Sequence, residues 1–146
     1  MKLIIERCPG LQEIEVSIRH DDQEKVERIV EVLNFDTTII GRRDEHNYPL
    51  VAADILYFES VDEKVFAYDE SEVYQIRHRL YELDNMLNNA GFSRISISVI
   101  VNRRKIVHFK SSFNGRLEAQ LTNGEKLLVS RSYVKELKQA LGGDRT

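Results

Sequence analysis

The sequence predicts a mostly β fold with short helices, in the α+β class. Several short segments alternate apolar and polar residues at period two, as half-buried strands do, and three stretches space apolar residues as helices do. Two Asn-Gly pairs, Asn114-Gly115 and Asn123-Gly124, are strong hairpin signals. The length of 146 residues fits one ordinary domain with a small extension.

The first forty residues are expected to form a small ββα-like extension. Lys2–Glu6 is a short apolar run and Ile14–Ile18 alternates at period two, which predicts two strands. Asp21 or Asp22 can then cap a helix over residues 22–34, whose apolar side chains fall on one stripe. We assign residues 1–40 to this extension, 41–142 to the main domain and 143–146 to a tail, with a soft boundary between 35 and 41.

The main domain is expected to open with strands. The apolar stretch Thr37–Ile40 ends at Gly41, and the polar tract 42–49 that follows is interpreted as a loop or a hairpin. Ile55–Phe58 predicts a buried strand, and Val65–Tyr68 predicts its hairpin partner.

The longest predicted helix runs from about Glu70 to Ala90. Asp69 with Glu72 makes a capping box, and Gly91 stands where a left-handed stop belongs. The apolar stripe consists of Val73, Ile76, Leu80, Leu83 and Leu87. The spacing of this stripe is almost a heptad, but three turns fall short of a coiled coil, so core packing is favoured over a dimer seam.

Strands and one short helix complete the chain. Residues 95–101 alternate with Ile95, Ile97, Val99 and Val101 on one side, which predicts a single strand. The two Asn-Gly pairs predict a β-meander over residues 105–113, 116–122 and 125–129. A short amphipathic helix near Tyr133–Leu141 is expected to follow.

The charge of the chain is strongly polarised. Residues 91–146 hold 11 basic and 4 acidic side chains, a net charge of +7, whereas residues 1–40 carry −4 and residues 41–90 carry −6. A cationic block can collect phosphates although the whole chain has a net charge of −3, because the local field steers association. On charge alone, an ordinary solvated face explains this basic block as well as nucleic-acid binding does.

Several functional classes are disfavoured. The single Cys8 excludes an internal disulfide and a Cys-based zinc site, and no signal peptide or membrane span is visible, so we expect a cytoplasmic protein. The four histidines are scattered without metal-ligand spacing. Because no phosphate loop, nucleophile elbow or paired-carboxylate arrangement is present, we expect no catalytic residue, metal, cofactor or small-molecule substrate.

Five stretches together resemble the LytTR family of bacterial DNA-binding domains. They occur in family order and spacing: Asp54–Ser60, Gly91–Ile95, Ser98–Asn102, Asn123–Leu127 and Val129–Val134. The resemblance covers roughly Gly41 to Leu141 and implies an elongated arrangement of small antiparallel β-sheets, in which strand-connecting loops enter the major groove. It also implies a stand-alone transcriptional regulator without a receiver domain, and not a helix-turn-helix protein.

The resemblance also implies which residues touch DNA. Base readout is expected from Lys64 in the first loop and from Arg131 in the third. In the second loop Ile97 stands where family members commonly carry a polar or basic residue, so either Ser96 is the contact or Ile97 touches a thymine methyl. Phosphate contacts are expected from Arg94, Arg103, Arg104, Lys126, Ser130 and Lys135.

Three of the neighbouring side chains also have structural explanations. Arg94 is as well explained by pairing with a carboxylate such as Glu59 as by DNA contact. Asn102 is favoured as a residue that bonds the backbone, and Tyr133 as one that packs against the sheet.

The expected partner is double-stranded DNA, bound by a homodimer or by paired copies on a repeated site, because one small domain reads few base pairs. Self-association through residues 1–40 is as well supported as its absence. The resemblance adds the hypothesis of an inhibitory membrane protein as a partner. The alternative function is a protein-interaction module of the same fold that has lost specific DNA binding, which Ile97 would favour.

Overall fold

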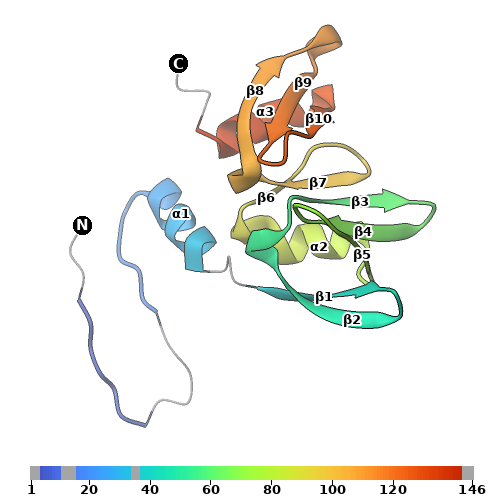
Figure 1. Ribbon diagram of the computed structural model, residues 1–146. Coiled ribbons are helices and arrows are strands. Elements are labelled where there is room, and N and C mark those ends of the chain that lie inside the picture. The colour runs from blue at the N-terminus through green and yellow to red at the C-terminus, as the bar shows by residue number, and fades with distance from the viewer. Residues whose placement is uncertain (1–3, 11–15, 34–36, 143–146) are drawn as a thin grey trace.

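The chain forms two antiparallel sheets with three α-helices in the computed structural model, which describes residues 4–10, 16–33 and 37–142 (Figure 1). The larger sheet has seven strands in the order β2-β1-β5-β4-β3-β7-β6, and the smaller has three in the order β10-β9-β8. The mostly β prediction is therefore confirmed. The elements are α1 (Gln23–Leu33), β1 (Thr38–Arg43), β2 (His46–Val51), β3 (Tyr57–Val61), β4 (Lys64–Tyr68), β5 (Val73–Ile76), α2 (Leu80–Leu87), β6 (Phe92–Arg94), β7 (Val99–Asn102), β8 (Ile106–Ser111), β9 (Leu117–Leu121), β10 (Lys126–Val129) and α3 (Arg131–Ala140), with short 3-10 turns η1 (Ala52–Asp54), η2 (Asn88–Ala90), η3 (Arg103–Lys105) and η4 (Phe113–Gly115).

Two hairpins of the larger sheet have the same dipeptide, Asp-Glu, in their turns. Asp44 and Glu45 join β1 to β2 with φ values of 51° and 65°, and Asp62 and Glu63 join β3 to β4 with 50° and 65°. Two central residues with positive φ define the type I′ turn, whose twist matches that of the strands. The polar tract 42–49 is thus a hairpin, and the predicted pairing of residues 55–58 with 65–68 is confirmed.

The predicted helix 70–90 is wrong over residues 70–79. Val73–Ile76 is strand β5, which pairs with both β4 and β1, and the helix begins only at Leu80. The Asp69 carboxylate does accept the N–H groups of Ser71 and Glu72, at 2.9 and 2.6 Å, but in a β-turn and not at a helix cap. The place between β4 and β1 supplies hydrogen-bond partners along both edges of β5, and these outweigh the helical spacing of the sequence.

The remainder of this segment agrees with the prediction. Leu80, Leu83 and Leu87 are buried in the core, which confirms core packing of this stripe, and Gly91 has a φ of 93° at the end of the helical region.

The predicted strand 95–101 is a loop over residues 95–98 followed by the first three residues of β7. β6 and β7 pair antiparallel, and residues 95–98 connect them. The Ile95 N–H donates to the Val99 carbonyl at 3.0 Å, and the Ser98 N–H donates to Ser96 Oγ at 3.2 Å. These bonds reverse the chain, so Ile95 is buried while Ile97 is 83% exposed, although the two lie on one side of an extended strand.

Two apolar cores hold the sheets together. One core lies between α2 and the larger sheet and includes Phe58 and Phe92; the other lies between the two sheets and α3 and includes Leu56 and Leu137. β8, β9 and β10 form the predicted meander, and the C-terminal helix is confirmed with its start at Arg131.

The N-terminal extension contains α1, capped by the Asp22 carboxylate, which accepts the N–H groups of Glu24 and Lys25. Residues 4–6 and 16–18 form no strand, so the two-strand part of the ββα-like prediction is wrong there; the other residues of those two segments lie outside the described ones. The boundary between extension and domain remains a prediction. Within the described ranges, no helix combines the length and apolar character that a membrane crossing needs.

Candidate nucleic-acid interface

The 95–98 loop bonds to two segments that lie far from it in the sequence. The Ser60 N–H, at the end of β3, donates to the Ser98 carbonyl at 2.8 Å. The Ser130 N–H, just before α3, donates to the Ile95 carbonyl, also at 2.8 Å. Figure 1 shows the β3–β4 turn, the loop between β6 and β7 and the start of α3 on the same side of the molecule. We call these three the reading segments: residues 60–64, 95–98 and 130–133.

The predicted base-reading residues all lie in these segments. Lys64 is exposed and begins β4, directly after the Asp62-Glu63 turn, and Arg131 is exposed at the first position of α3. Ile97 projects from the loop with 83% of its surface exposed. Ser96 is half-buried, and its hydroxyl oxygen accepts the Ser98 N–H. The described geometry therefore presents the Ile97 side chain, and turns that of Ser96 toward its own loop.

Gly115 in η4 touches Arg131 and had no predicted role beyond the hairpin turn. A Cβ at this glycine, whose φ is 74°, would lie 2.9 Å from Arg131 Cδ. Phe113, in the same turn, is 87% exposed. The contact joins the β8–β9 turn to the third reading segment. The Asn-Gly pair was a signal for the turn only, since nothing in the sequence links residue 115 to residue 131.

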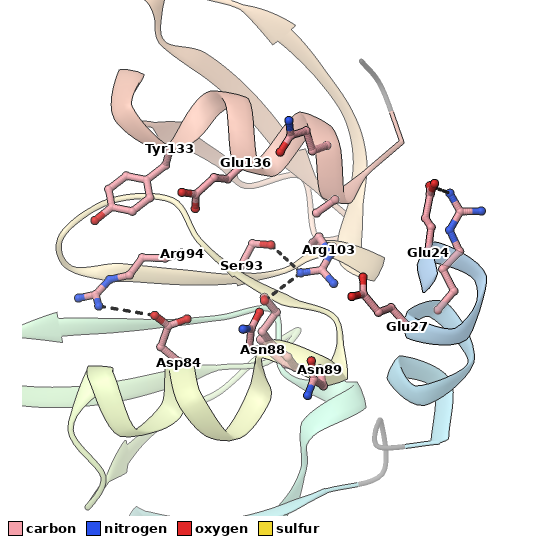
Figure 2. Close-up of a pocket in the computed structure, with 14 residues that line it drawn as sticks. Glu24, Glu27, Asp84, Asn88, Asn89, Ser93, Arg94, Arg103, Tyr133 and Glu136 are labelled. Atoms are coloured by element: carbon pink, nitrogen blue, oxygen red, sulfur yellow. Dashed lines mark hydrogen bonds and ion pairs between the residues drawn. The ribbon is translucent and has the colours of Figure 1, made fainter. Parts of the chain in front are cut away.

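Arg94 holds the 95–98 loop from behind. Its Nε donates to the Ser96 carbonyl at 3.2 Å and its Nη2 donates to the Ile97 carbonyl at 2.6 Å. Its Nη1 lies 3.9 Å from a carboxylate oxygen of Asp84, on α2 (Figure 2). Pairing of Arg94 with a carboxylate is therefore confirmed, but the partner is Asp84 and not Glu59, which instead accepts a hydrogen bond from the Tyr68 hydroxyl at 3.1 Å.

The other predicted phosphate contacts are spread over the domain. Arg103 and Arg104 lie in η3, at the opposite end of β7 from the 95–98 loop, and Arg103 donates to the Phe92 carbonyl and to Ser93 Oγ (Figure 2). Lys126 begins β10 with its Nζ 3.8 Å from a Glu118 carboxylate oxygen. Ser130 and the exposed Lys135 lie at and after the start of α3. All these phosphate contacts remain predictions.

Asn102 and Tyr133 have the structural roles that the sequence favoured. Asn102 is fully buried; its Nδ2 donates to the Ile55 carbonyl at 2.8 Å and its Oδ1 accepts the Arg104 N–H at 3.1 Å. Tyr133 is half-buried against the second core.

A polar cavity of about 590 Å³ lies beside the reading segments, between α1, η2, β6 and α3 (Figure 2). Arg94 and Tyr133 line one end of it, and Arg103 and Glu27 lie near α1 at the other end. Carboxylates and guanidinium groups line it together, so its lining does not select one sign of charge.

A family model described as the LytTr DNA-binding domain matches residues 45–142. The sensory transduction protein LytT of Enterococcus faecalis is 39% identical over 94 residues, which are 64% of this chain and 39% of that protein. A protein of Staphylococcus aureus described as an HTH-type transcriptional regulator is 28% identical over 122 residues, which are 84% of this chain and 82% of that one.

A solved LytTr DNA-binding domain from Bacillus cereus shares the fold. Its TM-score is 0.69 at 24% identity, and the match covers 73% of this chain and 97% of that domain. The described helices are separated by strands, with no helix-turn-helix among them, in agreement with this fold and not with the label of the Staphylococcus relative. The family match, which spans more than half of the sequence and contains all three reading segments, shows that the chain belongs to the LytTR family of DNA-binding domains.

Proposed function

We propose that this protein is a cytoplasmic transcriptional regulator, without catalytic activity, that binds duplex DNA sequence-specifically through the three reading segments. The observation that carries the proposal is the joining of these segments by two main-chain hydrogen bonds around the 95–98 loop. Side chains that project from a fixed frame can match the spacing of base edges, whereas independently mobile loops would lose entropy on binding.

Each exposed side chain suits a different contact in the major groove. Arg131 can donate two hydrogen bonds to O6 and N7 of guanine, and Lys64 can donate to the same acceptors. Ile97 offers no donor or acceptor and can contact the C5 methyl of thymine. The acidic pair Asp62-Glu63 beside Lys64 repels phosphates, which favours a position of this turn over bases.

Specific binding is proposed to use two copies, as a homodimer or as a pair on a repeated site. A module with three short reading segments covers few base pairs, while specific sites need a larger interface. The Staphylococcus match covers 122 residues of this chain, which is more than residues 45–146 contain. The match therefore includes part of the N-terminal extension. That segment is our candidate for self-association.

An inhibitory membrane protein is a further proposed partner, which rests on the family resemblance. Affinity capture from native membranes tests it: recovery of a membrane protein, with target expression raised or lowered by its deletion, would support the proposal. Capture of none, with unchanged expression, would contradict it.

Fluorescence anisotropy tests DNA binding. The protein is titrated with its own upstream DNA and a scrambled duplex between about 50 and 200 mM salt, where phosphate contacts weaken steeply. Arg131→Ala should weaken binding to the preferred site by about 5- to 150-fold, which corresponds to one bidentate guanine contact, and should change scrambled binding far less.

Arg77→Ala is the matched control, because Arg77 is exposed and lies outside the reading segments. It should change both affinities by less than about twofold, as a solvated charge does. Equal loss on both duplexes with Arg131→Ala would assign that side chain to phosphates. Wild-type binding that ignores sequence and salt would instead support the protein-interaction alternative.

A further inference from the structure

Arg94 is basic, near the reading segments and in the cationic part of the chain, yet its donors are directed into the protein. Its side chain is 24% exposed. Two of its nitrogens bond to carbonyl oxygens of its own loop and a third faces Asp84. A phosphate ligand would present these donors to solvent.

The two bonds determine where the loop points. Nε and Nη2 of one planar guanidinium bind the carbonyls of successive residues, Ser96 and Ile97, at 3.2 and 2.6 Å. Because each peptide unit is planar, fixing two successive carbonyls restricts the dihedral angles between them, and with them the direction of the Ile97 side chain. Lysine carries a single ammonium group and cannot reproduce this rigid fork.

Asp84 connects the loop to the core. It lies on α2 between the buried residues Leu83 and Leu87, so its backbone position is fixed by packing. The 3.9 Å approach of its carboxylate to Arg94 Nη1 gives the guanidinium a partner of opposite charge on the side away from the loop (Figure 2). Arg94 therefore spans from α2 to the tip of the loop.

The same loop carries the bonds to the other two reading segments. Ser98 accepts from Ser60 and Ile95 accepts from Ser130, one on each side of the two carbonyls that Arg94 binds. A change in the loop therefore reaches the β3–β4 turn and the start of α3.

We infer that Arg94, held by Asp84, is a positioning residue that fixes the 95–98 loop and thereby the relative placement of all three reading segments. The inference rests on the proposed DNA-binding function. It assigns Arg94 a contribution to sequence discrimination and none to the neutralisation of phosphates, contrary to its predicted phosphate contact.

Binding of Arg94→Lys and Arg94→Ala to the preferred and scrambled duplexes separates the two roles. A positioning residue predicts that Arg94→Lys loses about tenfold or more on the preferred site, stays within about twofold on scrambled DNA and keeps the salt slope. Asp84→Asn should change affinity in the same direction by less, because it keeps the shape of the side chain and removes only the charge. Arg77→Ala again controls for the loss of a surface cation.

A phosphate ligand predicts a different pattern. Arg94→Lys would then bind both duplexes nearly as the wild type does, and Arg94→Ala would weaken both equally and lower the salt slope by about one. Either result would overturn the inference.

Backbone amide NMR of Arg94→Lys gives a readout that does not need DNA. The amides of Ser96, Ile97 and Ser98 should shift, and those of Ser60 and Ser130 with them, while the amides of β9 and β10 keep their positions. Unchanged loop amides would refute the positioning role. If the wild type shows no site preference, the proposed function fails, and these amide shifts alone still decide whether Arg94 holds the loop.

Discussion

Asn102 offers a quantitative test of how the site is supported. Its side chain is fully buried and bridges two parts of the chain, because Nδ2 donates to the Ile55 carbonyl and Oδ1 accepts the Arg104 N–H. Asn102→Ala leaves the Ile55 carbonyl without this donor, which costs about 1–3 kcal/mol, and removes the bond to Arg104, worth about 1 kcal/mol. The expected loss in the free energy of unfolding is therefore about 2–4 kcal/mol.

A loss of this size should be easy to measure. A domain of about 100 residues loses about 4 °C in Tm per kcal/mol, so Tm should fall by about 8–16 °C. Urea unfolding followed by circular dichroism gives the free energy directly. Asn102→Asp is expected to cost at least as much, because it places a carboxylate beside the Ile55 carbonyl.

Asn47→Ala serves as the control, since Asn47 is exposed on the edge strand β2, and its cost should stay within about 0.5 kcal/mol. A cost below ~0.5 kcal/mol for Asn102→Ala, together with lost affinity for the preferred site, would refute the structural argument and make Asn102 a base reader.

Four further substitutions have defined outcomes. Glu63→Gly and Glu45→Gly should each raise the free energy of unfolding in urea by about 0.5–1 kcal/mol. Both residues have φ near 65°, and the strain of ~1–2 kcal/mol that glycine relieves exceeds its entropic cost. Of the two, only Glu63→Gly should also raise the affinity for DNA. Gly115→Ala should displace the Arg131 side chain and weaken the preferred site more than scrambled DNA in anisotropy; equal binding would show that the side chain adapts. Burial and a hydrogen bond to Glu125 raise the pKa of Tyr57 in the folded protein. The contribution of Tyr57 to the free energy of unfolding should therefore be constant below the pKa of an unfolded tyrosine, about 10, and fall as pH rises above it. Tyr57→Phe should make the free energy of unfolding fall less steeply in measurements between about pH 9 and 11.

Local signals in the sequence predicted the smaller sheet well and part of the larger one poorly. Asn114-Gly115 and Asn123-Gly124 specify turns through backbone preferences that need no distant partner. Val73 and Ile76, in contrast, are three residues apart, a spacing that suits a helix. The same two residues are the first and the last of the four-residue strand β5. The position between β4 and β1 favours the strand over the helix, because it offers hydrogen-bond partners on both sides, and it exists only after the sheet has formed.

The candidate site follows the same distinction. Lys64 and Arg131 could be placed from the resemblance, because each lies in a local motif of the family. The contacts of Arg94 with Asp84 and of Gly115 with Arg131 join residues 10 and 16 positions apart, and each partner alone is an ordinary surface residue in the sequence. Charge counting could not separate a cation that faces DNA from one that holds a loop.

The charge of the C-terminal block therefore overstates the cations at the reading segments. Of its basic side chains, Arg94 is bound to its own loop, and Arg103 and Arg104 lie at the far end of β7. Lys64, Arg131 and Lys135 are exposed cations that lie in these segments or shortly after them in the sequence. If each of these three cations displaced a counterion on binding, the slope of log Kobs against log salt concentration would be about −3. Two copies on the preferred site would double the number of these cations, so a slope near twice that value is the result expected for a second copy on the DNA.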